Sequence, residues 1–481
     1  MTTIDRRTLL KKGLAAAGGL AFAGPFQGML ARAVLAQEGR PPMGEGFGPL
    51  VPIPDKRDGV VRLELPEDFN YRSFSLTGEM MSDGVAVQGN HDGMAAFPAG
   101  GGRIRLVRNH EVNGPGAAFG DPSKAYDPMA KGGTSTLEIS PHAERVRSWV
   151  SANGTQMNCA GGAMPWGSWI TCEETVNGPD VGNDFTGQDN SLLMQQHGYI
   201  FDVPSSWGPG QHQKLVPIRS AGRFAHEAVA WAEGSLYLTE DNFGFPSGFY
   251  RYDPPVSPFT AGRLMDGGRL WMLAIDDGDT EPNELHTGQR VGEPLPVTWV
   301  EIDEPDKTFS GPEETSNDEA IVFVGDQGRA KGGAIFSRLE GIHATGDDVY
   351  IVSTQGGDAP GNPSGFGDGF GQVFKLDISE QTLTLVYESP GQEVLDLPDN
   401  VTVSPRGGVL LCEDGAVENF LRVVTPDGTL FDFARNAIAG REREEFAGAT
   451  FNPNDQVLYV NIQAASAFTF AIWGPFARGG L

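Results

Sequence analysis

Residues 158–175 read NCAGGAMPWGSWITCEET. Two short apolar runs flank a Pro-Trp-Gly turn, and this pattern is typical of a β-hairpin. The first run begins with an Asn-Cys pair, and the second ends with Cys172, Glu173 and Glu174. The start of the first strand and the end of the second lie at the same edge of an antiparallel hairpin. We therefore expect these polar groups to lie close together.

The same pattern recurs along the chain, and in five of six hairpins the polar ends are separated by 13 or 14 residues. The second strands are expected at Leu106–Glu111, Trp169–Thr175, Leu236–Asn242, Val349–Gln355, Val409–Gly415 and Leu458–Gln463. Radial repetition of such units predicts an all-β fold, a β-propeller with about six blades. The irregular intervals are compatible with five to seven. The polar ends of all blades should converge on one face around the central channel.

We expect a single propeller domain over residues 37–481, with loop insertions near 176–215 and 253–335. The first insertion is rich in Gly, Asp and Gln, which favours long loops. The second has acidic stretches between strand-like segments, which indicates outer blade strands and a surface excursion.

Residues 1–36 resemble a twin-arginine signal peptide, which lies outside the folded domain. Arg6 and Arg7 are followed by a Gly- and Ala-rich hydrophobic stretch that contains Arg32, so this stretch is a poor membrane span. We expect interaction with the twin-arginine translocase during export, and a periplasmic or secreted location.

The charge balance is strongly acidic, with 63 Asp and Glu against 35 Lys and Arg and a formal net charge of −28. Such a surface repels nucleic acid, so we expect no nucleic-acid binding. The three cysteines are few for an exported chain, and their odd number leaves at least one free thiol.

The converging face carries many candidate ligands for cations. They are Glu111, Cys172, Glu173, Glu174, Glu227, Glu240, Asp241, Glu340, Asp399, Glu413 and Asp414. Carboxylates gathered this closely repel one another, and their pKa values shift unless cations compensate the charge. Oxygen ligands suit Ca²⁺, whereas a thiolate favours a transition metal. The sequence therefore predicts a site with more than one metal ion.

Several side chains allow more than one interpretation. Cys172 could form a cross-hairpin disulfide with Cys159, bind a metal or remain an inert thiol. His226 is the best histidine candidate for a ligand or for a partner of a ligand. Arg338 shares a strand face with Glu340 and could clamp a phosphate or oxyanion, or form a surface salt bridge.

Motifs spread from about residue 80 onward resemble the PhoX family of exported bacterial alkaline phosphatases. They include RNHE (108–111), NCAGGAMPWGSWITCEET (158–175), GRFAHEAVA (222–230), LTEDN (238–242), SRLEG (337–341), PDNVTVSPRGGVLLCEDG (398–415) and EFAGATFNPNDQVLYVNIQ (445–463). The resemblance implies a β-propeller with two Fe³⁺ and up to three Ca²⁺ ions. It also implies metal-assisted hydrolysis of small phosphorylated substrates, namely phosphomonoesters.

Carried over motif by motif, the resemblance implies iron ligation by Cys172, Glu227 and Glu340, with Arg338 as a phosphate clamp at the catalytic centre. It implies calcium-side ligands at Glu173, Asp399, Asn400 and Glu413. Cys159 then becomes a packing residue, and Glu174 has no role. The chain has Arg-Leu-Glu-Gly at 338–341, where the family often has Arg-Pro-Glu-Gly.

Two other functions fit the residues without the resemblance. One is a calcium-dependent propeller hydrolase without iron, such as a lactonase, and the other is a metal-bound propeller that binds ligands without catalysis. The oligomeric state is not encoded in any pattern of the sequence.

Overall fold

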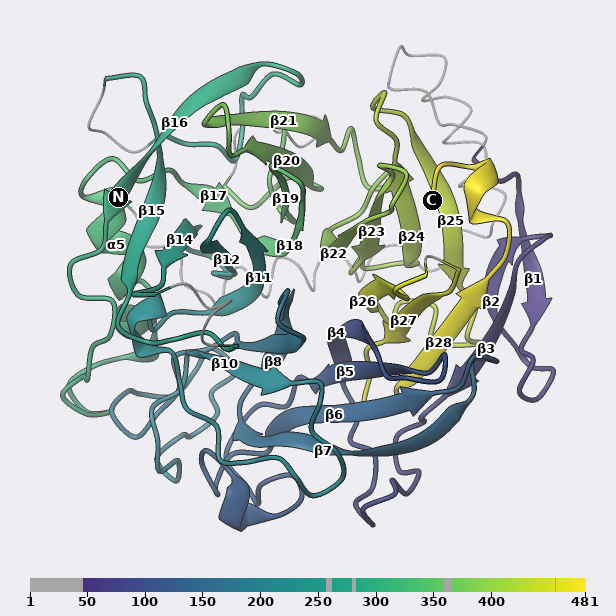
Figure 1. Cartoon of the computed structure of the whole chain (residues 1–481). Helices are drawn as coiled ribbons and strands as arrows, with labels where there is room; N and C mark the ends of the chain where they lie inside the picture. Colours follow the sequence, from purple (N-terminus) through teal and green to yellow (C-terminus); the bar gives the residue numbers. More distant parts are fainter. Residues whose placement is uncertain (1–45, 257–261, 279–282, 359–365, 455) are drawn as a thin grey trace.

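The computed structural model describes residues 46–256, 262–278, 283–358, 366–454 and 456–481. Within these residues, antiparallel sheets radiate from a common axis (Figure 1). Six inner strands of the described part surround the axis, and each contacts the inner strand of the next blade. In ring order they are β4 (His91–Pro98), β8 (Asn158–Ala163), β11 (His226–Ala232), β18 (Leu339–Thr345), β22 (Pro398–Val403) and β26 (Phe446–Phe451). The predicted six-bladed propeller is confirmed.

Each inner strand pairs with the next strand of its hairpin, and further strands complete the blade outward. Blade one adds β5 (Ile104–His110), β6 (Gly132–Ile139) and β7 (Arg145–Thr155), and blade two adds β9 (Ser168–Glu173) and β10 (Ile200–Pro204). Blade three adds β12 (Ser235–Glu240), β14 (Phe249–Asp253) and β15 (Arg269–Ile275). Blade four adds β19 (Asp348–Ser353), β20 (Gln372–Asp377) and β21 (Thr382–Glu388). Blade five adds β23 (Val409–Glu413), β24 (Phe420–Val424) and β25 (Leu430–Asn436), and blade six adds β27 (Leu458–Ile462) and β28 (Phe468–Trp473).

Strands from the N-terminal part complete the last two blades and close the ring. Strand β3 (Asn70–Phe74) pairs with β28 of blade six. Strands β1 (Leu50–Pro54) and β2 (Val61–Pro66) extend blade five through β25. Strand β16 (Pro294–Glu301) pairs with β15 and β21 and so joins blades three and four at their outer edges.

Every inner strand of the described ring has a β-bulge near its start. The register shifts fall between His91 and Met94, Asn158 and Gly161, His226 and Val229, Leu339 and Ile342, Pro398 and Val401, and Ala447 and Thr450. A bulge inserts one extra residue and re-aims the side chains beside it. Six bulges at equivalent places therefore turn six equivalent positions toward the axis.

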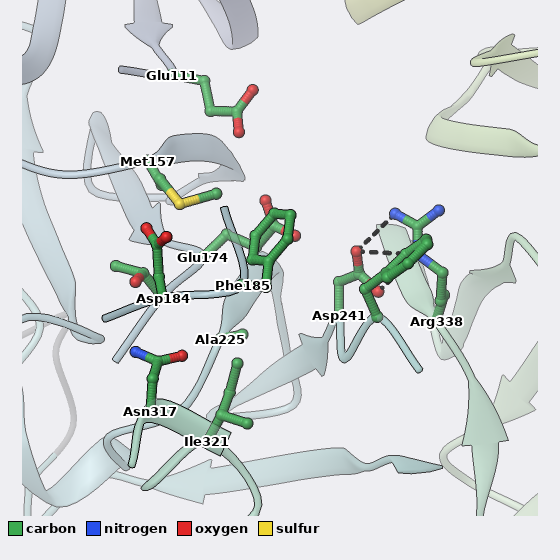
Figure 2. Close-up of a pocket in the computed structure, with 12 residues that line it drawn as sticks. Glu111, Met157, Glu174, Asp184, Phe185, Ala225, Asp241, Asn317, Ile321 and Arg338 are labelled. Carbon is green, nitrogen blue, oxygen red and sulfur yellow. Dashed lines mark hydrogen bonds and ion pairs between the residues drawn. The ribbon is translucent and has the colours of Figure 1, made fainter. Parts of the chain in front are cut away.

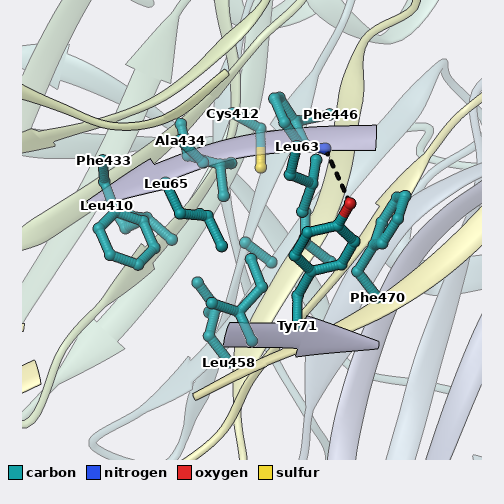
Figure 3. Close-up of a cluster of buried hydrophobic side chains, with 14 of the residues drawn as sticks. Leu63, Leu65, Tyr71, Leu410, Cys412, Phe433, Ala434, Phe446, Leu458 and Phe470 are labelled. Atoms are coloured by element: carbon teal, nitrogen blue, oxygen red, sulfur yellow. Dashed lines mark hydrogen bonds between the residues drawn. The ribbon is translucent and has the colours of Figure 1, made fainter. Parts of the chain in front are cut away.

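Apolar side chains between neighbouring blades form the core, and Figure 3 shows the cluster that joins blades five and six. Leu63 and Leu65 of β2 pack there against Leu410, Phe433 and other buried residues. Cys412 lies in the same cluster, and its side chain is fully buried. The Tyr71 hydroxyl accepts a hydrogen bond from the Leu63 amide at 3.2 Å (Figure 3).

The first expected insertion contains a strand besides its loops, and the second contains strands at the outer edges of blades three and four. The segment 176–215 includes β10, the outer strand of blade two. The segment 253–335 includes β15, β16, α4 (Asn317–Ile321) and α5 (Phe323–Arg329), while residues 257–261 and 279–282 lie outside the described part. Two-residue strands β13 (Pro246–Ser247) and β17 (Phe336–Ser337) pair with each other, and 3-10 turns lie at Pro122–Lys124, Arg219–Ala221 and Phe476–Arg478.

The proposed signal peptide at 1–36 lies outside the described residues. Among those that are described, no helix combines the length and apolar character needed to span a membrane.

Candidate metal centre

Five consecutive blades each turn one ligand-type side chain toward the axis at the bulge of the inner strand. These residues are Asp92, Cys159, Glu227, Glu340 and Asp399, and each directly follows the first paired residue of its hairpin. In blade six the register shift follows Ala447, so the residue at the bulge is Gly448, which has no side chain. The pattern shows that one structural position, repeated around the ring, supplies the inner ligands.

The second strands supply further ligand groups from the residue that follows their last paired position. These residues are Glu111, Glu174, Asp241 and Asp414. Figure 2 shows Glu111, Glu174 and Asp241 around one pocket, with Arg338 beside Asp241. The two sets together form a buried acidic centre at one end of the axis.

Ligand atoms in this centre fall into three overlapping groups, and the atoms of each group lie within 4.8 Å of one another. The groups are Asp92, Glu111 and Cys159; Cys159, Glu174 and Glu227; and Glu227, Glu340 and Asp399. Cys159 and Glu227 each belong to two groups, so the groups form one continuous chain.

Burial raises the pKa of the carboxyl groups that belong to these three groups, and neighbouring negative charges raise it further. The pKa of Glu227 lies well above its usual range because of burial and then the charges of Glu340 and Asp399. The pKa of Glu111 is raised to about 7 by burial and by Asp414. Burial and the charge of Asp92 also raise the pKa of the Cys159 thiol. Without cations, this centre therefore favours protonated carboxyl groups and a protonated thiol.

Glu227 provides the clearest test of whether the residues fit metal ions. Its side chain is fully buried, and among the described residues neither carboxylate oxygen has a hydrogen-bond partner. An unpaired buried carboxylate is costly unless a cation or proton compensates it. Because Cys159, Glu174, Glu340 and Asp399 surround it, the donor set fits a cluster of metal ions.

Arg338 lies at the edge of the centre and is held by two carboxylates. Its Nη2 donates to Asp241 at 2.7 Å and to Glu340 at 2.6 Å, and its Nε donates to Asp241 at 3.1 Å. The ion pairs with these two described residues do not use Nη1. The guanidinium also lies 5.2 Å from the Phe243 ring centroid. Arg338 has a φ of 52°, a left-handed conformation that is uncommon outside glycine and often marks functional sites.

The structure does not bring Cys172 or Glu173 to this centre. Cys172 lies in the apolar cluster with Ile170, Ile200 and Phe224, and the three cysteines are free thiols. Glu173 turns into its own blade. Successive side chains of a strand alternate between faces, so Glu173 points away from the face that Glu174 presents. Cys172 lies on the same face as Glu174 but two residues earlier, where the apolar cluster covers it. This placement does not support the expected ligand roles of Cys172 and Glu173, nor a disulfide between the two cysteines of the hairpin.

Glu413 and Asn400 also lie outside the three ligand groups, and both form hydrogen bonds with neighbouring residues. Glu413 pairs with Arg422 at 2.7 Å and accepts a hydrogen bond from the Asp396 amide at 2.8 Å. Asn400 donates to Asp399 at 2.6 Å and accepts from the Gly448 amide. Asn400 thus orients a candidate ligand, and the axis-facing carboxylate of blade five's second strand is Asp414.

His226 is a hydrogen-bonding residue of blade three. One ring nitrogen lies 2.9 Å from the Gly222 carbonyl oxygen, and burial lowers the pKa of the imidazole to about 3. Glu240 likewise serves its own blade, since it accepts hydrogen bonds from the Gly248 amide and the Tyr250 hydroxyl, both at 2.8 Å. His226 is the first paired residue of β11, and Glu240 is the last paired residue of β12. Each lies one residue before the position that faces the axis.

Two members of the ligand groups, Asp92 and Cys159, were missed in the sequence. The signal that could have found them is their shared position at the start of the first strand, directly after His91 and Asn158. Glu227 occupies the same position after His226, and Glu340 follows Leu339 in the same way.

The fold and the site together define a six-bladed β-propeller with a buried acidic centre on its axis that could hold metal ions. The family model described as alkaline phosphatase PhoX matches residues 45–466. The chain belongs to the PhoX alkaline phosphatase family, and it is a phosphoric monoester hydrolase.

The structure is similar to that of Pseudomonas fluorescens PhoX in complex with vanadate, a transition state analogue, with a TM-score of 0.62 and 17% sequence identity. The alignment covers 91% of this chain and 99% of that one. At this identity the likeness supports the propeller fold. A gluconolactonase from Xanthomonas campestris, XC5397, matches with a TM-score of 0.42 and 12% identity over 89% of this chain and 98% of that one. No curated protein sequence matched.

Proposed function

We propose that the protein is an exported phosphatase that hydrolyses phosphomonoesters at a multinuclear centre of iron and calcium. The observation that carries this proposal is the continuous chain of buried ligand groups around Glu227, with Arg338 at its edge. The acidic centre has more negative charge than its own protein environment neutralises.

The proposed ligands differ from those implied by the motifs. We assign the iron side to Cys159 and Glu227, which share a group, because the thiol of these groups favours a transition metal. Glu340, which groups with Glu227, is assigned to the same side. We assign the calcium side to other carboxylates, with Asp399 and Asp414 as candidates. Within the described ring, the two strand positions supply eight carboxylates and one thiol, a donor set suited to more than one metal ion.

The residues beside the centre have complementary roles in binding a phosphate ester. When bound, the metal ions would neutralise phosphate charge and act as Lewis acids toward phosphoryl oxygens. Asp241 and Glu340 hold the Arg338 guanidinium at the pocket, and its Nη1, which these ion pairs do not use, would donate to a phosphoryl oxygen. Phosphoryl transfer depends mainly on positioning and on charge stabilisation. The metal ions and the fixed Arg338 guanidinium would provide both.

The proposal is tested on full-length protein produced in a host supplied with iron and calcium. Elemental analysis should find both metals, and the protein should release phosphate from phenyl phosphate. Protein that is folded and active without iron would contradict the iron assignment and favour the calcium-dependent hydrolase. Iron-loaded protein without turnover of any phosphomonoester would favour a binding protein.

Export to the periplasm or beyond the cell is supported by Arg6 and Arg7 ahead of an Ala- and Gly-rich hydrophobic stretch. Replacement of both arginines by lysine in the full chain should leave the protein in the cytoplasm. Unchanged export of that variant would contradict recognition by the twin-arginine translocase.

A further inference from the structure

The pocket at the acidic centre has apolar as well as charged lining residues. Its charged lining is Glu111, Glu174, Asp184, Asp241 and Arg338, and Figure 2 shows Asp241 and Arg338 on the side opposite Asp184. The rest of the lining includes a set that we name the apolar wall: Met157, Phe185, Ala225, Phe243 and Ile321. A phosphate ester has the same two parts, one charged and one organic.

Phe185 is the most accessible member of the apolar wall, with 38% of its surface exposed. Its loop is fixed by the preceding residue. Asp184 Oδ1 accepts hydrogen bonds from the Thr186 amide at 2.9 Å, the Thr186 hydroxyl at 2.6 Å and the Gln188 amide at 3.1 Å. Asp184 Oδ2 accepts from Asn113 at 2.7 Å. The loop therefore holds an aromatic ring at the pocket without burying it in the core.

The other members of the wall are fixed as well. Met157 has a left-handed φ of 42°, and its carbonyl oxygen accepts a hydrogen bond from the Glu174 amide at 2.9 Å. Phe243 packs against the Arg338 guanidinium. Ile321 ends helix α4, which begins with a capping box between Ser316 and Glu319. The wall is thus a preformed surface to which the segment before β8, the loop before β10, the ends of the β11–β12 hairpin and helix α4 contribute.

The charges around the wall restrict what can bind there. Within the described lining, Arg338 is the one basic residue, and its ion pairs with Asp241 and Glu340 already compensate its charge. Asp184 adds a carboxylate beside Phe185. A negatively charged organic group would be repelled at this side of the pocket, whereas an uncharged aromatic ring could pack against Phe185.

We propose that the apolar wall is the subsite for the organic group of the substrate, and that Phe185 makes the protein selective for phosphomonoesters of uncharged aromatic alcohols. This inference rests on the proposed function, because the phosphoryl group must bind at the acidic centre beside the wall. Phe185 is a specificity-determining residue in this assignment.

The test measures binding without turnover. Dissociation constants of phenylphosphonate, methylphosphonate and 4-carboxyphenylphosphonate are measured by calorimetry on metal-loaded wild type, Phe185→Ala and Leu192→Ala. Leu192 is a matched control, since it is an apolar residue with 62% exposure that follows in the same segment and does not line the pocket. Wild type and the control should bind phenylphosphonate about tenfold more tightly than methylphosphonate, a preference of about 1.4 kcal/mol.

Phe185→Ala should lose this preference, and the para carboxylate should weaken binding of the ring to wild type. Equal binding of phenylphosphonate and methylphosphonate to wild type, or an unchanged preference in Phe185→Ala, would overturn the proposal. Turnover of phenyl phosphate is assayed separately. Selective binding without any turnover would count against the proposed function and leave the subsite supported. Turnover without selective binding would support the proposed function and count against the subsite.

Discussion

Glu173 and Glu174 are neighbours in the chain, yet they face opposite environments. Glu173 accepts hydrogen bonds from the Gln156 amide and the Gly198 amide, both at 2.9 Å, and from His197 at 2.6 Å. Glu174 faces the axis, and its ligand oxygen belongs to the group formed with Cys159 and Glu227. One carboxylate therefore stabilises blade two, and the other is available to a cation.

Because of this difference, the same Glu→Gln substitution should have different effects at the two positions. Glu174→Gln should lower the metal content measured by elemental analysis, because an amide is a weaker ligand than a carboxylate. Glu173→Gln should keep the metals and lower the free energy of unfolding by about 2–4 kcal/mol, because an NH₂ group would face the surrounding donors. Loss of metal from Glu173→Gln at unchanged stability would contradict the assignment.

The two cysteines of the same hairpin give a second prediction. Cys159→Ser should reduce the iron content, since Cys159 is the thiol among the ligand groups. Cys172→Ala should retain iron and lower the free energy of unfolding by about 1 kcal/mol, because it removes one sulfur atom from an apolar cluster. The opposite pattern, in which Cys172→Ala alone loses iron, would restore the role that the motif implies.

Much of the fold could be predicted because hairpins, turns and polar strand ends are visible as local patterns. The side chains that face the axis could not be chosen with the same certainty. At the end of a strand, Cys172, Glu173 and Glu174 are all ligand-type residues, and a one-residue error moves a side chain to the other face. At the start of the first strand, a bulge adds a residue and interrupts the alternation. No residue type marks the bulge in this sequence, so Cys159 could be selected only by comparing its position with that of Glu227 and Glu340 in the other hairpins.

Substitution of Arg338 should separate phosphate binding from metal binding. Arg338→Lys keeps the charge and loses the planar group that donates to both Asp241 and Glu340. We expect the inhibition constant of inorganic phosphate to rise about tenfold, with metal content unchanged, since tenfold corresponds to the loss of roughly one charge-assisted hydrogen bond. Arg103→Lys is the matched control, because Arg103 pairs with Glu138 at 2.8 Å in blade one. Unchanged phosphate inhibition in Arg338→Lys would exclude the clamp.

The pH dependence of stability should contain a contribution from His197. Burial disfavours the charged imidazole, but the charges of Glu173 and Asp127 outweigh it and raise the pKa of His197 to about 9. Because this value lies above the ordinary pKa of 6.5, the stabilisation is fully present below pH 6.5 and is lost as the pH rises through about 9. The shift corresponds to roughly 3 kcal/mol.

His197→Gln removes the titrating group while it keeps a side chain that can form hydrogen bonds. The difference in free energy of unfolding between wild type and His197→Gln, measured by urea denaturation at equal metal loading, should be largest near pH 6 and should shrink between pH 6.5 and 9. Comparison of the two proteins cancels the titration of the acidic centre, which is common to both. A difference that stays constant across this range would mean that His197 is not protonated between Glu173 and Asp127.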